Sequence, residues 1–241
     1  MTPVVAPDRS CDAEDMNGHR PGSRRLLTRA VPAAAGAVYG AVVRPRLLTW
    51  GATPEEAARA YPGDDLVPGA HASSTMATTL PAPPAEVWPW LAQMGCNRGG
   101  WYSWDRLDNG GRPSAERIVP EWQHLEVGQR LDSVPSGHAW FTVAVLAPES
   151  TLVLRAQLEL PSGRPFDTRY EPPPRAYVDA VWGFHLRPAP GDRTRVVVRT
   201  RGRGRPGALM RIMDVLYNEP AHLIMQTRQF RNLRDRVGGT L

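Results

Sequence analysis

Hydrophobic and polar residues alternate along several stretches of the chain. In residues 152–160, leucines and one alanine occupy every second position, and mostly polar residues lie between them. Similar β-prone runs cover residues 73–80, 139–146, 176–186 and 195–201. A period of two is typical of antiparallel strands that turn one face to water. These segments therefore predict an antiparallel sheet.

The C-terminal end of the chain has helical spacing instead. Apolar residues recur every three or four positions from Leu209 to Leu216 and again from Leu223 to Val237. Pro220 lies between the two stripes and should bend the helix, because proline lacks the N–H that continues the hydrogen-bond ladder. We therefore expect one long, bent helix at the end of the chain.

Two shorter helices are predicted around the first strand. Thr53 can cap a helix that starts at Pro54, with Glu56 completing a capping box, and this helix should end near Tyr61. Residues 85–94 have a second apolar face at helical spacing. No βαβ alternation appears in the strand-rich half, which argues against a parallel sheet. The predicted class is α+β, a curved antiparallel sheet closed by the C-terminal helix over an internal cavity.

The N-terminal region is expected to lie apart from this domain. Residues 1–25 are polar and rich in Pro, Gly and charge, which predicts a disordered leader. Residues 26–70 form a helical lead-in, and the main domain spans residues 71–238. The apolar run Ala30–Val43 is shorter than the roughly 20 residues of a spanning helix, so a packed or surface-lying helix is expected. A peripheral membrane contact through residues 26–48 is the alternative.

Composition restricts the partners. All 29 basic residues are arginines, and the net charge is +5. This charge permits weak attraction to anionic lipid, but we expect no nucleic-acid partner. The arginines between Arg199 and Arg211 either grip phosphates or pair with carboxylates across the sheet. Cys11 and Cys96 are far apart and form no CxxC, which fits a reducing, cytoplasmic compartment.

Motifs for metal or cofactor binding do not occur. The sequence has no HExxH, no Cys cluster and no GxSxG, so no metal site and no cofactor are expected. The segment from Gly202 to Gly207 matches GxGxxG, but a dinucleotide site needs a parallel βαβ unit, and the preceding strand is antiparallel. This segment is therefore interpreted as a turn rather than a nucleotide site.

Six short segments of the sequence are distinctive motifs. They are WGAT (Trp50–Thr53), APPAEVWPWLAQMG (Ala82–Gly95), RGGWYSWDRLDN (Arg98–Asn109), ERIVPEW (Glu116–Trp122), WGFHL (Trp182–Leu186) and VVVRTR (Val196–Arg201). Over about Trp50 to Val237 the chain resembles the START-like SRPBCC superfamily, in an uncharacterised bacterial branch labelled polyketide cyclase/dehydrase-like. The resemblance implies a helix-grip fold with a hydrophobic pocket. Members bind lipids, sterols, polyketides or hormones, and a minority catalyse cyclisation or dehydration.

The first functional hypothesis is a binding module for a small hydrophobic molecule such as a lipid or polyketide. Trp101, Tyr102 and Trp104 are expected at the mouth of the pocket, unless these rings simply cap the core. The expected lining consists of Phe141, Val143, Trp182, Phe184, Leu216, Tyr217 and Met225, and Arg199 is a further candidate for ligand contact.

The second hypothesis is an enzyme of the cyclase or dehydratase kind. It uses Asp105 or Glu121 as acid and base, with Arg199 or Arg201 holding an oxyanion. A structural alternative has Asp105 capping a helical turn and arginines pairing with both carboxylates. His222 on the final helix could reach the cavity, although a lone histidine is more often structural than catalytic.

Overall fold

The computed structural model describes residue 36, residues 38–169 and residues 171–239. The chain divides into two compact units, Met1–Val43 and Arg44–Leu241. In the first unit the described residues include a π-helical turn, η1 (Tyr39–Val43), with no buried side chain. The predicted disordered leader and most of the apolar run before η1 lie outside the described residues.

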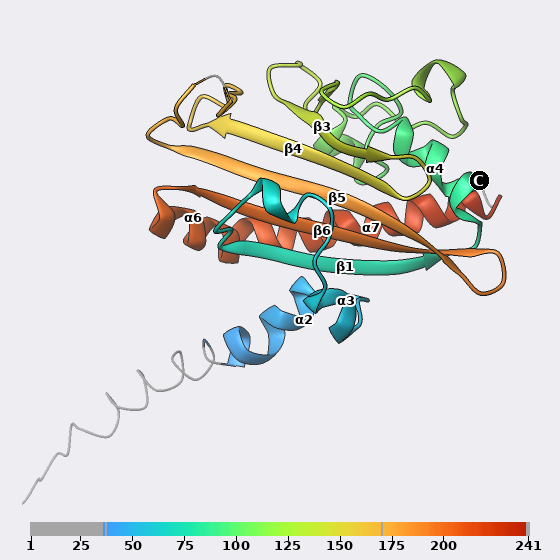
Figure 1. Ribbon diagram of the computed structural model, residues 1–241, viewed down its shortest axis with the longest axis horizontal. Coiled ribbons are helices and arrows are strands. Elements are labelled where there is room, and N and C mark those ends of the chain that lie inside the picture. The colour runs from blue at the N-terminus through green and yellow to red at the C-terminus, as the bar shows by residue number, and fades with distance from the viewer. Residues whose placement is uncertain (1–35, 37, 170, 240–241) are drawn as a thin grey trace, which may run out of the picture. The chain divides into compact units, whose positions relative to one another are not determined.

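Six antiparallel strands form one sheet in the second unit, in the order β1-β6-β5-β4-β3-β2 (Figure 1). They are β1 (Ala72–Leu80), β2 (Arg130–Asp132), β3 (Trp140–Ala147), β4 (Thr151–Glu159), β5 (Tyr177–Ala189) and β6 (Arg193–Arg205). The five predicted strands are present, and the short edge strand β2 is additional. The GxGxxG segment was predicted to be a turn, but its first four residues, 202–205, are the end of β6 and pair with β5.

The helices lie before, between and after the strands. They are α2 (Arg44–Leu48), α3 (Pro54–Ala58), η2 (Asp64–Leu66), α4 (Pro84–Ala92), α5 (Asp105–Asp108), η3 (Pro120–Trp122), α6 (Gly207–Met213), η4 (Asp214–Asn218) and α7 (Glu219–Val237). The last three follow one another without a break and form the long C-terminal helix, which runs along one face of the sheet (Figure 1). The predicted α+β architecture, with a sheet closed by a C-terminal helix as in a helix-grip fold, is confirmed.

The face of the sheet that packs against α7, called the inner face here, carries the main hydrophobic core. Leu154 lies opposite Trp182, and Leu152 lies opposite Phe184, which in turn pairs with Val198. Buried side chains of α4 and α7 complete this cluster, among them Val87, Leu91, Phe230 and Leu233. Burial of each such side chain contributes about 1.5–3 kcal/mol. The alternation predicted for residues 152–160 therefore does place its leucines on the inner face.

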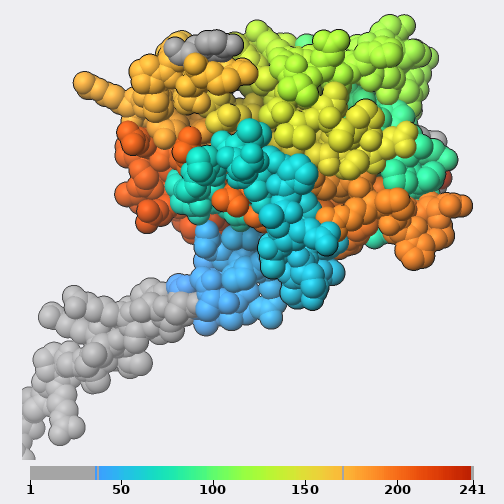
Figure 2. Space-filling view, viewed as in Figure 1, coloured from blue at the N-terminus to red at the C-terminus, as the bar shows by residue number. Residues whose placement is uncertain are grey.

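Residues 50–70 cross the opposite, outer face of the sheet (Figures 1 and 2). Tyr61 packs there against Ala77 and Val197. The capping box predicted at Thr53 is confirmed, since its hydroxyl accepts the N–H of Glu56 at 3.2 Å and its own N–H reaches the Glu56 carboxylate at 2.9 Å. The helix ends at Ala58, earlier than predicted.

Ion pairs fasten these residues to the sheet. The pairs are Arg195–Glu56 at 2.7 Å and Arg199–Asp64 at 3.1 Å, and within the sheet Arg203–Asp179 at 3.0 Å. The arginine run of β6 therefore pairs with carboxylates on the outer face. This outcome matches the structural interpretation of the run rather than a phosphate-binding patch.

The C-terminal helix is irregular directly before Pro220. Pro220 lacks the N–H that would bond to the carbonyl of residue 216, and its ring crowds that carbonyl. The preceding residues form the π-helical turn η4, whose wider ring of hydrogen bonds accommodates such a defect. The sequence predicted a bend of the helix at Pro220, and the structure has an irregular, π-helical turn directly before this residue.

Candidate functional site

A cavity of about 570 Å³ lies between the inner face of the sheet and the C-terminal helix. Its apolar lining includes Trp101, Phe141, Leu158, Leu160, Val178, Ala180, Trp182, Met210 and Met225. Its polar lining includes Ser103, Asp108, Ser133, Asp214, Asn218, Glu219, His222, Gln226 and Gln229; Arg201 and Arg203 of β6 border it, but their guanidinium groups pair with Asp64 and Asp179 on the outer face. This volume falls in the range of about 300–1,000 Å³ that is usual for small-molecule sites.

Three aromatic rings from three different elements meet at one wall of the cavity. Trp101 from the loop between α4 and α5, Phe141 from β3 and Trp182 from β5 have ring centroids 5.5–5.9 Å apart. Their planes are tilted by 37–72°, an arrangement in which ring edges meet ring faces and the contacts are favourable. This aromatic cluster gives the cavity a large, rigid apolar surface.

A chain of amide hydrogen bonds holds the helix to this cluster. Trp182 Nε1 donates to Oε1 of Gln226 at 3.3 Å, and the Gln226 amide donates to Oε1 of Gln229 at 2.7 Å. Gln229 in turn donates to the backbone carbonyl of Trp101 at 2.8 Å. Gln226 and Gln229 are both 1% exposed, so these bonds are shielded from water and fix the position of the rings.

Asp108, at the end of α5, lines the cavity without a hydrogen-bond partner for either carboxylate oxygen among the described residues. Burial raises the pKa of this carboxyl to about 6, and the negative charge of Asp105 acts in the same direction. Its own backbone N–H and the nearby Ser103 act in the opposite direction. The Ser103 hydroxyl, however, donates to the carbonyl of Met225 at 3.1 Å.

His222 on α7 is a second polar group on the cavity wall. Its Nε2 is buried and has no hydrogen-bond partner in the part of the chain that the structure describes. Burial lowers the pKa of the imidazole to about 4, so the ring is neutral at physiological pH. The cavity therefore contains two polar groups whose hydrogen-bonding capacity is not used by the described protein.

The predicted aromatic mouth is only partly assembled at the cavity. Trp101 is 3% exposed and lines it, whereas Tyr102 is fully buried behind it, where its hydroxyl accepts a hydrogen bond from Gln93 at 2.8 Å. Burial raises the pKa of the Tyr102 phenol well above its usual range. Trp104 is 44% exposed and stacks under the guanidinium of Arg228, away from the cavity lining. Of this loop, Trp101 is the ring that contacts the cavity.

The remaining predicted lining residues divide into two groups. Phe141, Trp182 and Met225 line the cavity, whereas Phe184 packs behind Trp182 with ring centroids 4.8 Å apart. Val143 is fully buried in the core.

The apolar stripe of α6 and η4 points away from the cavity. Leu216 and Tyr217 are 74% and 64% exposed, and Leu209, Ile212 and Met213 are also exposed. Met210, Asp214 and Asn218 on the other side of the same segment line the cavity. This part of the helix therefore turns a largely polar side inward.

The residues proposed for the enzyme, Asp105 or Glu121 as acid and base and Arg199 or Arg201 as the oxyanion contact, are not brought together at the cavity. Asp105 accepts a hydrogen bond from Ser114 at 2.5 Å, Glu121 is exposed, and Arg199 lies on the outer face with Asp64. None of these side chains faces the cavity, and Arg201 does not either, since it lies on the same face of β6 as Arg199 and its guanidinium is 3.8 Å from Asp64. The strand alternation had already indicated the outer position of Arg199, since Val198 and Thr200 face inward.

Sequence reasoning missed Asp108 and the glutamines as site residues. Asp108 lies three positions after Asp105 in a single helical turn, and nothing in that spacing tells which carboxylate is buried. Gln226 and Gln229 are one helical turn apart, on the same face as His222. A polar pair in the middle of an otherwise apolar helix face was the available signal.

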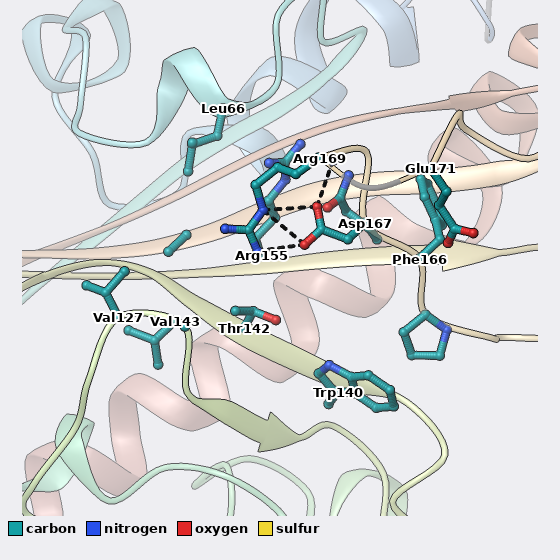
Figure 3. A pocket seen from close by; sticks show the side chains of 14 residues that line it. Leu66, Val127, Trp140, Thr142, Val143, Arg155, Phe166, Asp167, Arg169 and Glu171 are labelled. Atoms are coloured by element: carbon teal, nitrogen blue, oxygen red, sulfur yellow. Dashed lines mark hydrogen bonds and ion pairs between the residues drawn. The ribbon is translucent and has the colours of Figure 1, made fainter.

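A second hollow of about 570 Å³ lies at the outer face of β3 and β4 (Figure 3). It is more polar, and its charged residues already have partners: Arg155 pairs with Asp179, Asp167 with Arg169, and Glu171 with Arg164. We therefore regard the inner cavity, with its apolar wall and unused polar atoms, as the candidate site.

The described residues hold neither a cluster of metal-binding side chains nor a membrane-spanning helix. Among the residues that the structure describes, no three His, Cys, Asp or Glu side chains gather as metal ligands would. No helix in the described ranges combines the length and the apolar character that crossing a membrane requires.

No protein-family model matches the chain, and no curated protein matches it. Among solved structures it is similar to a protein from Mesorhizobium loti, with 17% identity, 70% of this chain and 99% of that chain covered, and a TM-score of 0.41. It is also similar to a protein from Nitrosomonas europaea, with 15% identity, 70% and 96% coverage, and a TM-score of 0.43. The fold described above rests on the strand order and the helix, not on these similarities.

Proposed function

We propose that this chain binds a small hydrophobic molecule in the cavity between the sheet and the C-terminal helix. The cavity itself carries the proposal: about 570 Å³ bounded on one side by Trp101, Phe141 and Trp182. A space of this size lined by large apolar side chains exposes surface that an apolar ligand would cover, and each Å² covered contributes about 25 cal/mol.

The helix-grip architecture supports the same proposal. The sequence segments that resemble the START-like SRPBCC superfamily include WYSWDRLDN, which supplies Trp101 and Asp108, and WGFHL, which supplies Trp182. We propose membership of that superfamily on these segments together with the fold. Lipids, polyketides and similar molecules are then the ligand class.

Native mass spectrometry of the purified full chain tests this proposal. We expect a co-purified molecule of a few hundred daltons that dissociates when the protein is denatured and is then identified in an organic extract. Ligand-free protein whose melting temperature is unchanged by apolar compounds would contradict the proposal, since a ligand that binds only the folded state must raise stability.

An enzyme of the cyclase or dehydratase kind is the alternative. Its acid–base groups would have to be Asp108 and His222, because these two titratable side chains line the cavity and have polar atoms with no partner in the described part of the chain. Turnover of the co-purified molecule that is lost in both Asp108→Asn and His222→Gln would favour the enzyme over the binding module.

Peripheral membrane contact through residues 26–48 is a separate proposal. In the described part of that segment Val38, Val42 and Val43 are 56%, 44% and 40% exposed. Apolar side chains beside arginines are typical of segments that lie in the surface of an anionic bilayer. Co-sedimentation with phosphatidylglycerol vesicles, lost when residues 1–43 are removed, is the expected result; equal sedimentation of both chains would contradict it.

A further inference from the structure

Most charged groups that line the cavity are paired with other protein groups. Glu219 accepts two hydrogen bonds from Arg44 at 2.7 and 2.8 Å, and Asp214 lies 3.5 Å from His71. Asp108 is the exception among the carboxylates of this wall, as far as the described residues extend. Although the chain has 29 arginines, none of those in the described ranges forms an ion pair with this acid.

A buried carboxylate without a partner is costly. Removing it from water costs several kcal/mol unless a cation or hydrogen-bond donors replace the lost hydration. The groups that act on Asp108 are its burial, Asp105, its own backbone and Ser103, and none of them is a cation. The Asp108 backbone and Ser103 offset part of this cost, and a donor in the cavity would recover more of it.

We propose, building on the proposed function, that the cavity selects hydrophobic amines, with the protonated nitrogen donating to the Asp108 carboxylate. The hydrocarbon part then covers the aromatic cluster of Trp101, Phe141 and Trp182. Those ring faces also attract a cation, because their quadrupoles place negative potential above each ring. A carboxylic acid of the same size finds no such match and meets the negative charge of Asp108.

The other ionisable groups of the wall are compatible with this selection. His222 adds no positive charge, because burial lowers its pKa to about 4. Its Nε2 has no partner among the described residues, so it can form a hydrogen bond with a polar atom of the ligand. Arg201 does not compete for a ligand, because its guanidinium lies on the outer face of the sheet, where its Nη1 is 3.8 Å from Asp64.

The probes are decylamine, decanol and decanoic acid, which share one tail and differ in the polar end. Isothermal titration calorimetry of the full chain at pH 7.5 should give an affinity order of amine, alcohol, acid, with the amine at least 10-fold tighter than the acid. Asp108→Asn should remove this difference and leave the decanol affinity within about 3-fold. Glu121→Gln removes an exposed carboxylate outside the cavity and should keep the wild-type order.

Each result decides a different point. Decanoic acid binding more tightly than decylamine, or an amine preference unchanged in Asp108→Asn, would overturn the amine inference and leave the proposed function standing. Binding of none of the three probes would remove the proposed function itself. If Asp108→Asn fails to fold, wild-type protein gives the same information: amine affinity should fall from pH 7.5 to pH 5, as Asp108 takes up its proton, and a flat profile would contradict the inference.

The charged groups around Asp108 allow this pH test to be interpreted. Asp105 lies on the same helical turn, and the cavity lining also includes His71, Asp214, Glu219 and His222, whereas the guanidinium groups of Arg201 and Arg203 lie on the outer face. His222 stays neutral over the range because its pKa is about 4. Asp108→Asn with a flat amine profile would assign the wild-type pH dependence to that carboxylate.

Discussion

The indole N–H of Trp182 donates to the side-chain oxygen of Gln226 at 3.3 Å, and this bond joins the middle of the sheet to the C-terminal helix. Gln226 donates a hydrogen bond to Gln229, and Gln229 donates one to the backbone carbonyl of Trp101. One amide therefore positions two of the three rings that form the apolar wall of the cavity.

Gln226→Leu keeps the size of this side chain and removes its amide. The indole N–H and the oxygen of Gln229 then lose a partner in a site closed to water, which costs about 1–3 kcal/mol for each group left unpaired. We expect the free energy of unfolding in urea to fall by at least about 2 kcal/mol. Ile224→Ala on the exposed side of the same helix is the control and should change it by less than about 0.5 kcal/mol. Equal effects of the two substitutions would contradict the role given to the amide.

Asp108→Asn should stabilise the ligand-free protein at neutral pH. The folded pKa of Asp108 is raised to about 6, so the folded state holds its proton more tightly than the unfolded state, and this acid costs stability above pH 6. The cost disappears as the pH falls towards the ordinary value. We expect a gain on the order of 1–3 kcal/mol at pH 7.5 that vanishes near pH 4, measured by urea unfolding at both pH values. A loss of stability at pH 7.5 would mean that the carboxylate has a partner in the protein.

His185 makes the opposite contribution. It is 4% exposed on the outer face against Tyr61, neither ring nitrogen has a described partner, and burial lowers its pKa to about 4. Between pH 6.5 and about pH 4 this histidine is protonated in the unfolded state but neutral in the folded state. Its full contribution to the free energy of unfolding is therefore present above pH 6.5 and is lost progressively as the pH falls to about 4. His185→Phe should flatten this part of the stability curve. An unchanged slope between pH 6.5 and 4.5 would show that His185 is protonated in the folded protein.

Gly204 brings β6 close to its neighbours. A Cβ at this position would lie 2.5 Å from the carbonyl oxygen of Tyr177 and 2.9 Å from Cγ of Met210. We expect Gly204→Ala to lower the melting temperature clearly, with a loss of about 1–3 kcal/mol from overpacking. Gly207→Ala meets nothing within 4 Å and serves as the matched control, with an unchanged or slightly higher melting temperature. Equal melting temperatures for the two variants would contradict the close packing.

The sequence predicted the sheet and its sidedness well because each strand has its own local signal. The leucines of β4 alternate with mostly polar residues, and this alternation predicts a strand. Thr53 and Glu56 have the spacing of a capping box, and they form one. Strand β2 was missed, since three residues with Leu131 as the one apolar side chain give no period to detect. It forms only because β3 offers it an edge.

The candidate site was harder to predict because tertiary contacts decide it. Tyr102 has a positive φ of 57° and is buried in the core, whereas Trp104, two residues later, is exposed. No pattern in the sequence predicts this change of backbone conformation. The apolar stripe at Leu216 suggested an inward face, but the π-helical turn before Pro220 shifts the register, and the helix turns Asp214 and Asn218 inward instead. Rules based on periodicity fail at functional surfaces more often than elsewhere.

One pair of substitutions tests the cavity most directly. Ala180 lines the inner cavity and Ala144 lines the outer hollow, so Ala180→Phe and Ala144→Phe place the same bulk on opposite faces of the sheet. N-phenyl-1-naphthylamine, a probe that fluoresces in apolar surroundings, is titrated into wild type and both variants after circular dichroism confirms their folds. The probe should bind wild type and Ala144→Phe alike and at least 10-fold more weakly to Ala180→Phe. Equal binding to Ala180→Phe and wild type would contradict ligand binding between the sheet and the helix.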